Sequence, residues 1–325
     1  MKFRSRSAIA GLIIAMLVII CGIFVARRPS YSRKVQAIAV ALPMSSNPFW
    51  VSVRRGVEKA AQELNNQGRY QILIRETVDL DPLGQVEILN NFLERGDVVA
   101  LLVGPASDNT IVPAVSKYAS RGIPVVVIDT PLDSKALGSG SVGMSAFIGS
   151  DNKQGGVLAG QSMLAALEGK PPSVLLLKGK DEHQSAIDRS VGFNEAVANK
   201  GIEVTTVEGE WSRLKAQELT YAQYSKKRFG GVFAHNDDMA MGAIQALRLL
   251  EISEDEWPVV IGFDATSEGL SAIERGEMYA SVKQDPITLG YEGLRSAFRI
   301  LSRDGAVEST RLLKPSLVPP QRVSK

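Results

Sequence analysis

Residues that carry common catalytic and metal chemistry are scarce in this sequence. Its 325 residues include one cysteine, Cys21, and two histidines, His183 and His235. Cys21 lies within an apolar N-terminal run, so the rest of the chain can form no internal disulfide and offers no thiolate nucleophile. Two histidines are too few for the usual zinc sites, and neither stands beside an evident nucleophile. We therefore expect no catalytic residue, no metal site and no cofactor.

Clustered positive charge is also missing from most of the chain. Seven of the 37 Lys and Arg residues lie among the first 34 residues, which leaves 30 basic residues against 35 acidic ones in the remainder. Nucleic-acid binding requires concentrated positive charge that neutralises phosphates. The mildly acidic body therefore argues against nucleic acid as a partner.

One long hydrophobic run is present, near the N-terminus. Residues 8–26 (AIAGLIIAMLVIICGIFVA) are 19 uncharged residues. As a helix they would span about 28 Å, close to the roughly 30 Å hydrocarbon core of a bilayer. We favour an uncleaved anchor, with residues 1–34 as anchor and linker. A cleaved signal peptide is one alternative, although its apolar region is usually shorter and ends at a small-residue cleavage site. A lipoprotein signal is another, disfavoured by the bulky Ile20 before Cys21.

Beyond residue 34, apolar runs rich in β-branched residues alternate with stretches of helical period. Val53, Val57 and Ala60 share one helical face, and Met239 and Ala243 share another. Strands and helices in alternation indicate an α/β fold, with doubly wound parallel sheets covered by helices on both faces. The predicted strands are Ala37–Leu42, Ile72–Arg75, Val98–Val103, Pro124–Asp129, Ser173–Leu177, Gly231–Ala234, Val259–Phe263 and Tyr279–Val282.

The pattern also predicts two lobes rather than one. A chain of 325 residues is longer than one typical domain, for which about 100 to 200 residues is usual. The polar segment Ser150-Asp151-Asn152 follows five strand candidates, the first four given above and a β-like stretch at Ala146-Phe-Ile, and the alternation then begins again. We interpret this segment as the first crossing between the lobes.

Candidate ligand contacts follow the ends of predicted strands, where open α/β sheets place their ligands. Asn47 suits a helix N-cap, but capping does not explain the adjacent aromatics Phe49 and Trp50, whose faces can stack on a sugar. Asp129 and Asp264 each end a strand, and a carboxylate can accept from both hydroxyls of a vicinal diol. For each aspartate, capping of the next helix is the alternative.

Three further residues have a weaker signal. Asn236 is either an N-cap or a ligand contact, and Trp211 lies at a strand-to-helix junction. Arg189 lies in a helix-like stretch and, taken alone, would be a solvated surface charge.

From about residue 35 to its end, the chain resembles sugar-binding proteins of the ribose and allose type, which are type I periplasmic binding proteins. The resemblance implies a fold of two lobes joined by a hinge that the chain crosses three times. It is carried by the segments Asn47-Pro-Phe-Trp, Gly122-Ile-Pro-Val-Val-Val-Ile-Asp, Ser150-Asp-Asn, Asp188-Arg-Ser-Val-Gly-Phe, Glu210-Trp-Ser-Arg, Phe233-Ala-His-Asn-Asp-Asp-Met-Ala-Met-Gly-Ala, Gly262-Phe-Asp and Val282-Lys-Gln-Asp-Pro.

The resemblance also implies the site and the lobe boundaries. Crossings near Ser150, Gln284 and Leu313 would give a first lobe of residues 35–150 plus 285–312 and a second of 151–284 plus 313–325. Thr130 is counted with the site, although ribose- and allose-type proteins usually have a charged residue there, a difference that disfavours ribose itself. The implied sugar contacts are Asn47, Phe49, Trp50, Asp129, Arg189, Trp211, Asn236, Asp264 and Gln284.

The expected function is that of a binding protein on the periplasmic or extracellular face, anchored in the cytoplasmic membrane by residues 8–26. It would capture a small neutral sugar and present it to the permease of an ABC importer. The alternative is a membrane-anchored sensing subunit that works with a histidine kinase or chemoreceptor. LacI-type repressors share this fold, but here an apolar run stands in place of their DNA-binding helices.

Overall fold

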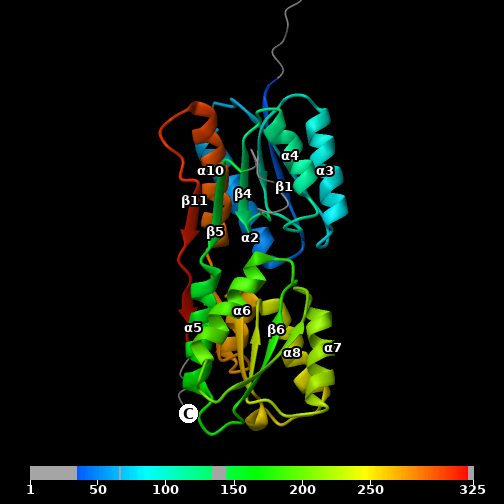
Figure 1. Cartoon of the computed structure of the whole chain (residues 1–325), viewed down its shortest axis with the longest axis vertical. Helices are drawn as coiled ribbons and strands as arrows, with labels where there is room; N and C mark the ends of the chain where they lie inside the picture. Colours follow the sequence, from blue (N-terminus) through cyan, green and yellow to red (C-terminus); the bar gives the residue numbers. More distant parts are fainter. Residues whose placement is uncertain (1–34, 66, 134–143, 321–325) are drawn as a thin grey trace, which may run out of the picture. The chain divides into compact units, whose positions relative to one another are not determined.

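Figure 1 shows the computed structural model, which describes residues 35–65, 67–133 and 144–320. The chain divides at Gln36, and the body from Gln36 onward is described below. The predicted membrane span, residues 8–26, lies outside the described residues. In the part of the chain that is described, no helix has both the length and the apolar character that crossing a membrane requires.

The first lobe is built on a six-stranded sheet with all neighbours parallel, in the order β11-β5-β4-β3-β1-β2. Every residue of β1 is buried, with alternate side chains in the two cores on opposite faces of the sheet. Helices α3 and α4 cover one face, and α2 and α10 pack together on the other (Figure 1). Its elements are Ala37–Leu42 (β1), Pro48–Leu64 (α2), Gln71–Glu76 (β2), Pro82–Glu94 (α3), Val98–Val103 (β3), Val112–Ser120 (α4), Val125–Asp129 (β4), Ala146–Ser150 (β5), Pro286–Ser302 (α10) and Thr310–Leu313 (β11).

The second lobe has a sheet of the same size and layout, in the order β12-β10-β9-β8-β6-β7. Its neighbours are parallel except for β12, which runs antiparallel to β10. Its elements are Asn152–Ala166 (α5), Ser173–Lys178 (β6), Gln184–Val197 (α6), Glu203–Glu208 (β7), Arg213–Tyr224 (α7), Gly231–Ala234 (β8), Asp237–Leu249 (α8), Glu254–Glu256 (η1, a 3₁₀ helix), Val259–Asp264 (β9), Ser267–Glu274 (α9), Ala280–Lys283 (β10) and Ser316–Val318 (β12).

The chain passes between the sheets three times along its described length. It leaves the first sheet after β5, returns to that lobe between β10 and α10, and leaves it again between β11 and β12. As a result, β11 and β12 follow one another closely in sequence but belong to different sheets. The expectation of an α/β fold with two mainly parallel sheets is confirmed.

Close packing of helices α5 and α6 depends on glycine. A Cβ atom at Gly192 would lie 2.0 Å from the carbonyl oxygen of Lys153, and one at Gly156 would lie 2.2 Å from that of Arg189. Contacts this short leave no room for a side chain, so glycine alone lets the two backbones approach. This packing fixes α6, the helix that carries Arg189.

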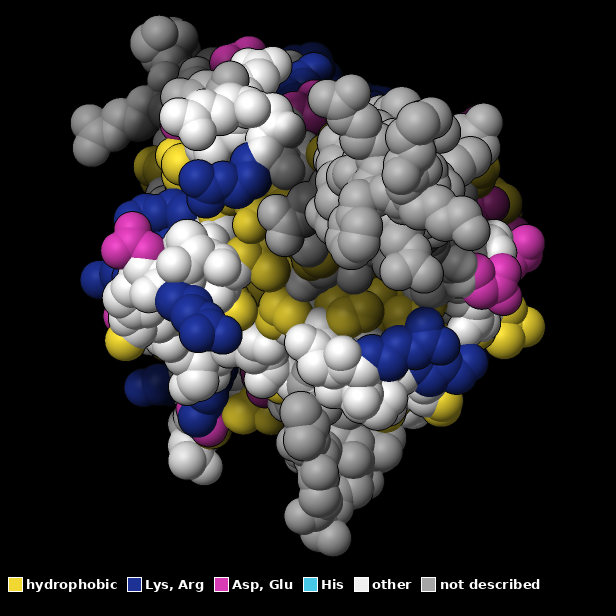
Figure 2. All heavy atoms as spheres, turned by 90° about the horizontal axis from the view of Figure 1, so that it is seen from above, with side chains coloured by type: hydrophobic (Ala, Val, Ile, Leu, Met, Phe, Trp, Pro, Cys, Tyr) yellow, Lys and Arg dark blue, Asp and Glu magenta, His cyan; other side chains and the backbone are white. Residues whose placement is uncertain are grey.

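The end of the first lobe that faces away from the second lobe is shown in Figure 2. Hydrophobic side chains gather in the middle of this face, with Lys and Arg side chains beside them. A groove here is lined by Leu64, Tyr70 and Phe298 together with arginines such as Arg69 and Arg295. The groove lies where the strands of the first sheet begin. The site described below lies at the other end of these strands.

Candidate functional site

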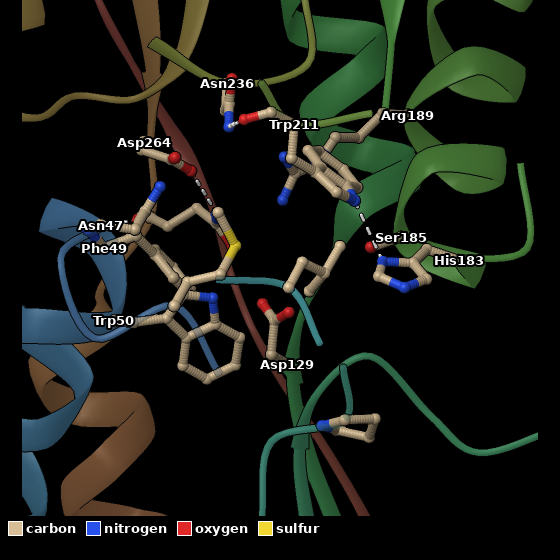
Figure 3. Close-up of a pocket in the computed structure, with 14 residues that line it drawn as sticks. Asn47, Phe49, Trp50, Asp129, His183, Ser185, Arg189, Trp211, Asn236 and Asp264 are labelled. Atoms are coloured by element: carbon tan, nitrogen blue, oxygen red, sulfur yellow. Dashed lines mark hydrogen bonds between the residues drawn. The ribbon is translucent and has the colours of Figure 1, made fainter. Parts of the chain in front are cut away.

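A pocket lies between the two lobes, where strands of both sheets end (Figure 3). The empty space in this pocket, counted together with its open mouth, is about 470 Å³. Side chains from both lobes converge on it, as expected of a ligand site at the carboxyl ends of parallel strands. It is lined by Met44, Asn47, Phe49, Trp50, Leu80, Pro105, Asp129, His183, Ser185, Arg189, Trp211, Asn236, Asp264 and Gln284.

Nine of the ten residues predicted from the sequence line this pocket, and Thr130 does not. Thr130 is only 1% exposed, and its hydroxyl donates to the carboxylate of Asp108 at 3.1 Å. The backbone of Asp129 has a positive φ of 74° and ends strand β4. Asp129 faces the pocket, whereas Thr130, the next residue, is held inside the lobe by Asp108. The placement of Thr130 among the ligand contacts was therefore wrong.

Two tryptophans, one from each lobe, lie against glycines that directly follow strands. A Cβ atom at Gly104, after β3, would lie 2.5 Å from the ring of Trp50, and one at Gly179, after β6, would lie 2.2 Å from that of Trp211. Phe49 meets Trp50 edge to face, with ring centroids 5.3 Å apart. The pocket thus has aromatic surface from both lobes, a suitable cover for the apolar faces of a sugar ring.

Asn47 and Asn236 both cap helices and line the pocket. The Oδ1 atom of Asn47 accepts from the amide of Phe49 at 2.9 Å, and that of Asn236 accepts from the amide of Met239 at 2.8 Å. Capping and lining are therefore not alternatives for these two residues. Asp264 is different, because the cap of the following helix, α9, is Thr266. The capping alternative for Asp264 is wrong, and its carboxylate is left for other partners.

Arg189 is the buried cation of the site. Its Nε donates to Asn152 Oδ1 at 2.9 Å, a second nitrogen donates to the carbonyl of His235, and the guanidinium carbon lies 3.7 Å from the ring centroid of Phe263. Burial lowers the pKa of Arg189, while the nearby Asp264 and Asp129 raise it. Since a guanidinium is not deprotonated in proteins, the group brings one positive charge to the pocket.

The two aspartates are held in surroundings that disfavour their charge. Burial raises the pKa of Asp129 to about 6, and it raises that of Asp264 well above its ordinary value, while Arg189 opposes both shifts. Gln284 donates to Asp264 at 2.6 Å, and its own buried Oε1 has no hydrogen-bond partner among the described residues. A ligand with several hydroxyl donors would satisfy these acceptors.

Four residues that line the pocket have a left-handed backbone, which is uncommon for residues other than glycine. They are Met44, Asp129, Trp211 and Asp264, with φ angles of 53°, 74°, 63° and 108°. Such conformations cost on the order of 1 to 3 kcal/mol each, and they concentrate where function requires a fixed geometry. Their gathering around one pocket supports a functional site there.

Five lining residues were not predicted: Met44, Leu80, Pro105, His183 and Ser185. The nitrogen of the Trp211 indole donates to Nδ1 of His183 at 3.0 Å. The sequence search considered this histidine only as a catalytic or metal-binding group. Its position directly before a helix that follows a strand was the signal that could have found it.

Comparison with known proteins decides the family. Residues 38–305 match the family model described as periplasmic binding protein domain. The chain belongs to the periplasmic binding protein family. It is 30% identical to the ribose import binding protein RbsB of Bacillus subtilis over 84% of this chain and 85% of that protein. RbsB of Haemophilus influenzae is 29% identical over 81% of this chain and 85% of its own length.

Solved structures agree with this periplasmic binding protein in fold. An ABC transporter solute-binding protein from Agrobacterium vitis with bound D-fucose superposes with a TM-score of 0.78 at 25% identity, over 89% of this chain and 97% of that one. The family consists of substrate-binding proteins rather than enzymes, in line with the expectation drawn from the scarcity of catalytic residues.

Proposed function

We propose that this chain is an extracytoplasmic binding protein that captures one small neutral sugar between its lobes and presents it to the permease of an ABC importer. The observation that carries the proposal is the set of half-buried Asp129 and Asp264 and buried Arg189 between aromatic walls from both lobes. Two hydroxyl acceptors, one donor group and flanking rings match a monosaccharide in its hydrogen bonding and in its apolar faces.

The charge of the pocket favours a neutral ligand. With both carboxylates ionised the set carries a net charge of −1, and no other Lys or Arg is among the described residues that line the pocket. Burial lowers the pKa of His183 to about 4 and that of His235 well below its ordinary value, so neither imidazole is positive at neutral pH. A sugar acid or phosphate would bring further negative charge into a buried site, at a cost of several kcal/mol if left unpaired.

The relatives support a sugar as the ligand class. Those reported above include ribose import binding proteins, and the Agrobacterium vitis structure holds D-fucose. A D-allose-binding periplasmic protein of Escherichia coli is 27% identical over 79% of this chain and 82% of its own length. These names describe import proteins, which favours a permease over a sensor as the partner.

A calorimetric screen tests the ligand class directly. Neutral pentoses and hexoses, ribose included, would be compared with the corresponding sugar acids and sugar phosphates. We expect micromolar or tighter binding of at least one neutral sugar. Tight binding of a sugar acid or phosphate alone would contradict the proposal, because it would require positive charge that the pocket lacks.

Capture requires the lobes to move, and we place the hinge at the three crossings near Ser150, Gln284 and Leu313. Closure around the ligand is the expected motion, since the lining residues come from both lobes. Small-angle X-ray scattering should show a smaller radius of gyration on addition of the bound sugar. An unchanged radius would contradict capture by closure.

The proposal includes a membrane anchor at residues 8–26. Its basis is the uncharged run of 19 residues and the poor cleavage site after it. N-terminal sequencing of the mature protein, after separation of membrane and soluble fractions, tests it. A mature chain that starts near Arg27 in the soluble fraction would show a cleaved signal instead.

A further inference from the structure

The loop between β3 and α4, residues 104–111, reaches from the first lobe to the second, and we call it the latch loop. It is held by Gln85 of helix α3, a residue with no exposed surface. The amide of Gln85 donates to the carbonyl of Gly104 and accepts from the backbone nitrogen of Ala106, both at 2.8 Å. This pair of bonds fixes the loop before it meets its partner.

Asp108 of the latch loop caps a helix of the other lobe. Its Oδ2 accepts from the backbone nitrogen of Gln184 at 2.7 Å. Gln184 is the first residue of α6, and the residue at the N-cap position, His183, makes no capping hydrogen bond with its side chain. The first N–H groups of a helix need outside acceptors, and negative charge at this end is stabilising. Asp108 therefore supplies to α6 the cap that its own lobe does not provide.

Thr130 orients this carboxylate. Its hydroxyl lies 3.1 and 3.2 Å from the two oxygens of Asp108, which is itself only 4% exposed. The residue that the sequence placed among the sugar contacts thus supports the capping group instead. Because Asp108 and Thr130 belong to one lobe, their contact persists when the lobes separate, whereas the bond to Gln184 does not.

His183 makes a second bond across the cleft, and this one reaches the pocket. Since the indole of Trp211 donates to Nδ1 of His183 at 3.0 Å, Nδ1 carries no proton and Nε2 does. Nε2 lies 3.3 Å from the carbonyl oxygen of Ala106 in the latch loop and can donate to it. The tryptophan that lines the pocket is therefore linked through one imidazole to the opposite lobe.

We propose that Asp108 is a positioning residue that caps α6 across the cleft in the closed state only, and so couples closure of the lobes to the placing of Arg189. The inference rests on the proposed function, because it assumes that the lobes separate to admit a sugar. In the open form, water solvates both the carboxylate and the free N–H of Gln184. Closure replaces these waters with a hydrogen bond to the carboxyl group of Asp108, whose pKa burial raises to about 7, at the N-terminus of the helix that carries Arg189.

Two substitutions remove this one bond from opposite sides. Asp108→Ala deletes the acceptor, and Gln184→Pro deletes the donor at the first helical position, where proline is well tolerated. Gln184→Ala is the matched control, because it keeps the backbone N–H and loses only the side-chain bond to Asp188. The full-length protein and the sugar found by calorimetry would be used, with tryptophan fluorescence as the signal for binding.

Asp108→Ala and Gln184→Pro should each weaken sugar affinity about 2- to 150-fold near neutral pH, the range between loss of a hydrogen bond to a neutral acceptor and loss of one to a charged acceptor. The loss should lie mainly in faster dissociation, because the bond forms only after the sugar has entered. The double variant should bind the sugar no more weakly than the single variant with the lower affinity, since both changes remove the same bond. Gln184→Ala should keep affinity close to that of the unaltered protein.

Amide exchange at Gln184, measured with the sugar bound, reads the cap directly. The Gln184 amide should exchange more slowly in the unaltered protein than in Asp108→Ala, while amides in the middle of α6 should be unchanged. The proposal would be overturned if Asp108→Ala released the sugar at the same rate as the unaltered protein and the Gln184 amide exchanged equally fast in both. Failure of the unaltered protein to bind any neutral sugar would instead contradict the proposed function, and the exchange comparison with whichever sugar acid or phosphate does bind would still decide whether Asp108 caps α6.

Discussion

Asp129 and Asp264 occupy equivalent positions in the two sheets. Their strands, β4 and β9, stand third in the strand orders of the first and second sheet, and each aspartate is the last residue of its strand. Both have a positive φ. The lobes thus contribute one carboxylate each from the same place in a shared layout, and only the second lobe adds a cation, Arg189. Ligand specificity therefore depends as much on Arg189, in which the lobes differ, as on the pair of carboxylates that they share.

Removal of the Asp129 charge should stabilise the ligand-free protein above about pH 6. The pKa of Asp129 is about 6 in the folded protein and about 3.9 in the unfolded chain. Asp129 therefore contributes its full stabilisation of the fold below pH 4, and this contribution is lost as the pH rises through about 6. Asp129→Asn avoids this loss. Its free energy of unfolding should exceed that of the unaltered protein by roughly 1 to 3 kcal/mol at pH 7 and by little at pH 4.

Calorimetric melting of both proteins from pH 4 to 8 measures this difference. The exposed Asp79→Asn serves as the control and should show no pH-dependent gain. Sugar affinity should fall in Asp129→Asn even as stability rises, because functional groups are often held at a cost to stability. A constant difference in melting temperature across the pH range would show that burial does not shift the pKa of Asp129 as described.

Truncation of Asp264 should weaken sugar binding without unfolding the protein. Loss of a charged hydrogen-bond acceptor costs roughly 1.5 to 3 kcal/mol, equivalent to about a 10- to 150-fold change in affinity. Titration calorimetry of Asp264→Ala with the bound sugar measures the loss, and the exposed Asp181→Ala is a suitable control. Undiminished affinity in Asp264→Ala would remove this aspartate from the site.

A methyl group at Gly179 should displace the indole of Trp211. Because the added Cβ would lie 2.2 to 2.4 Å from three ring atoms, Gly179→Ala should reduce sugar affinity and shift the tryptophan emission. In a Trp211→Phe background the smaller ring relieves the clash, so the same glycine substitution should cost less there. A double-mutant cycle measured by calorimetry tests this coupling, and strictly additive losses would contradict it.

The contact between α5 and α6 should be intolerant of any side chain at Gly192. Its Cβ would meet the backbone of α5 at 2.0 Å, and backbone cannot move aside as a flexible side chain can. Overpacking of this kind costs about 1 to 3 kcal/mol. Gly192→Ala should therefore lower the melting temperature by several degrees, while the exposed neighbouring change Val191→Ala should not. Equal melting temperatures would show that the helices can separate at little cost.

Most of the strands could be predicted because they are buried on both faces. Each of the eight predicted strands is present, with ends that differ by no more than one residue. Strand β7, Glu203–Glu208, was missed because it pairs only with β6 at the sheet edge, where its polar side chains give no apolar run. Strands β11 and β12 are short and, unlike the equally short but buried β8 and β10, they are largely exposed and give no apolar run.

The predicted residues at and after strand ends line the pocket, except Thr130, whereas Asp108 and His183, which make contacts across the cleft, were not predicted. Thr130 was wrong because a positive φ at Asp129 turns the next side chain into the lobe, and the sequence does not give that angle. Asp108 was missed although it follows the predicted strand Val98–Val103 within a polar loop. Its partner is a backbone N–H, which no sequence motif marks.

The last strand of each sheet comes from one short stretch near the C-terminus. Only Lys314 and Pro315 separate β11 from β12, and α10, which packs against the first sheet, also comes late in the chain. Neither sheet can be completed until this stretch has been made. Early termination would leave both sheets with an open edge able to pair with other chains. Completion of the two sheets is therefore tied to a single segment of the chain, residues 310–318.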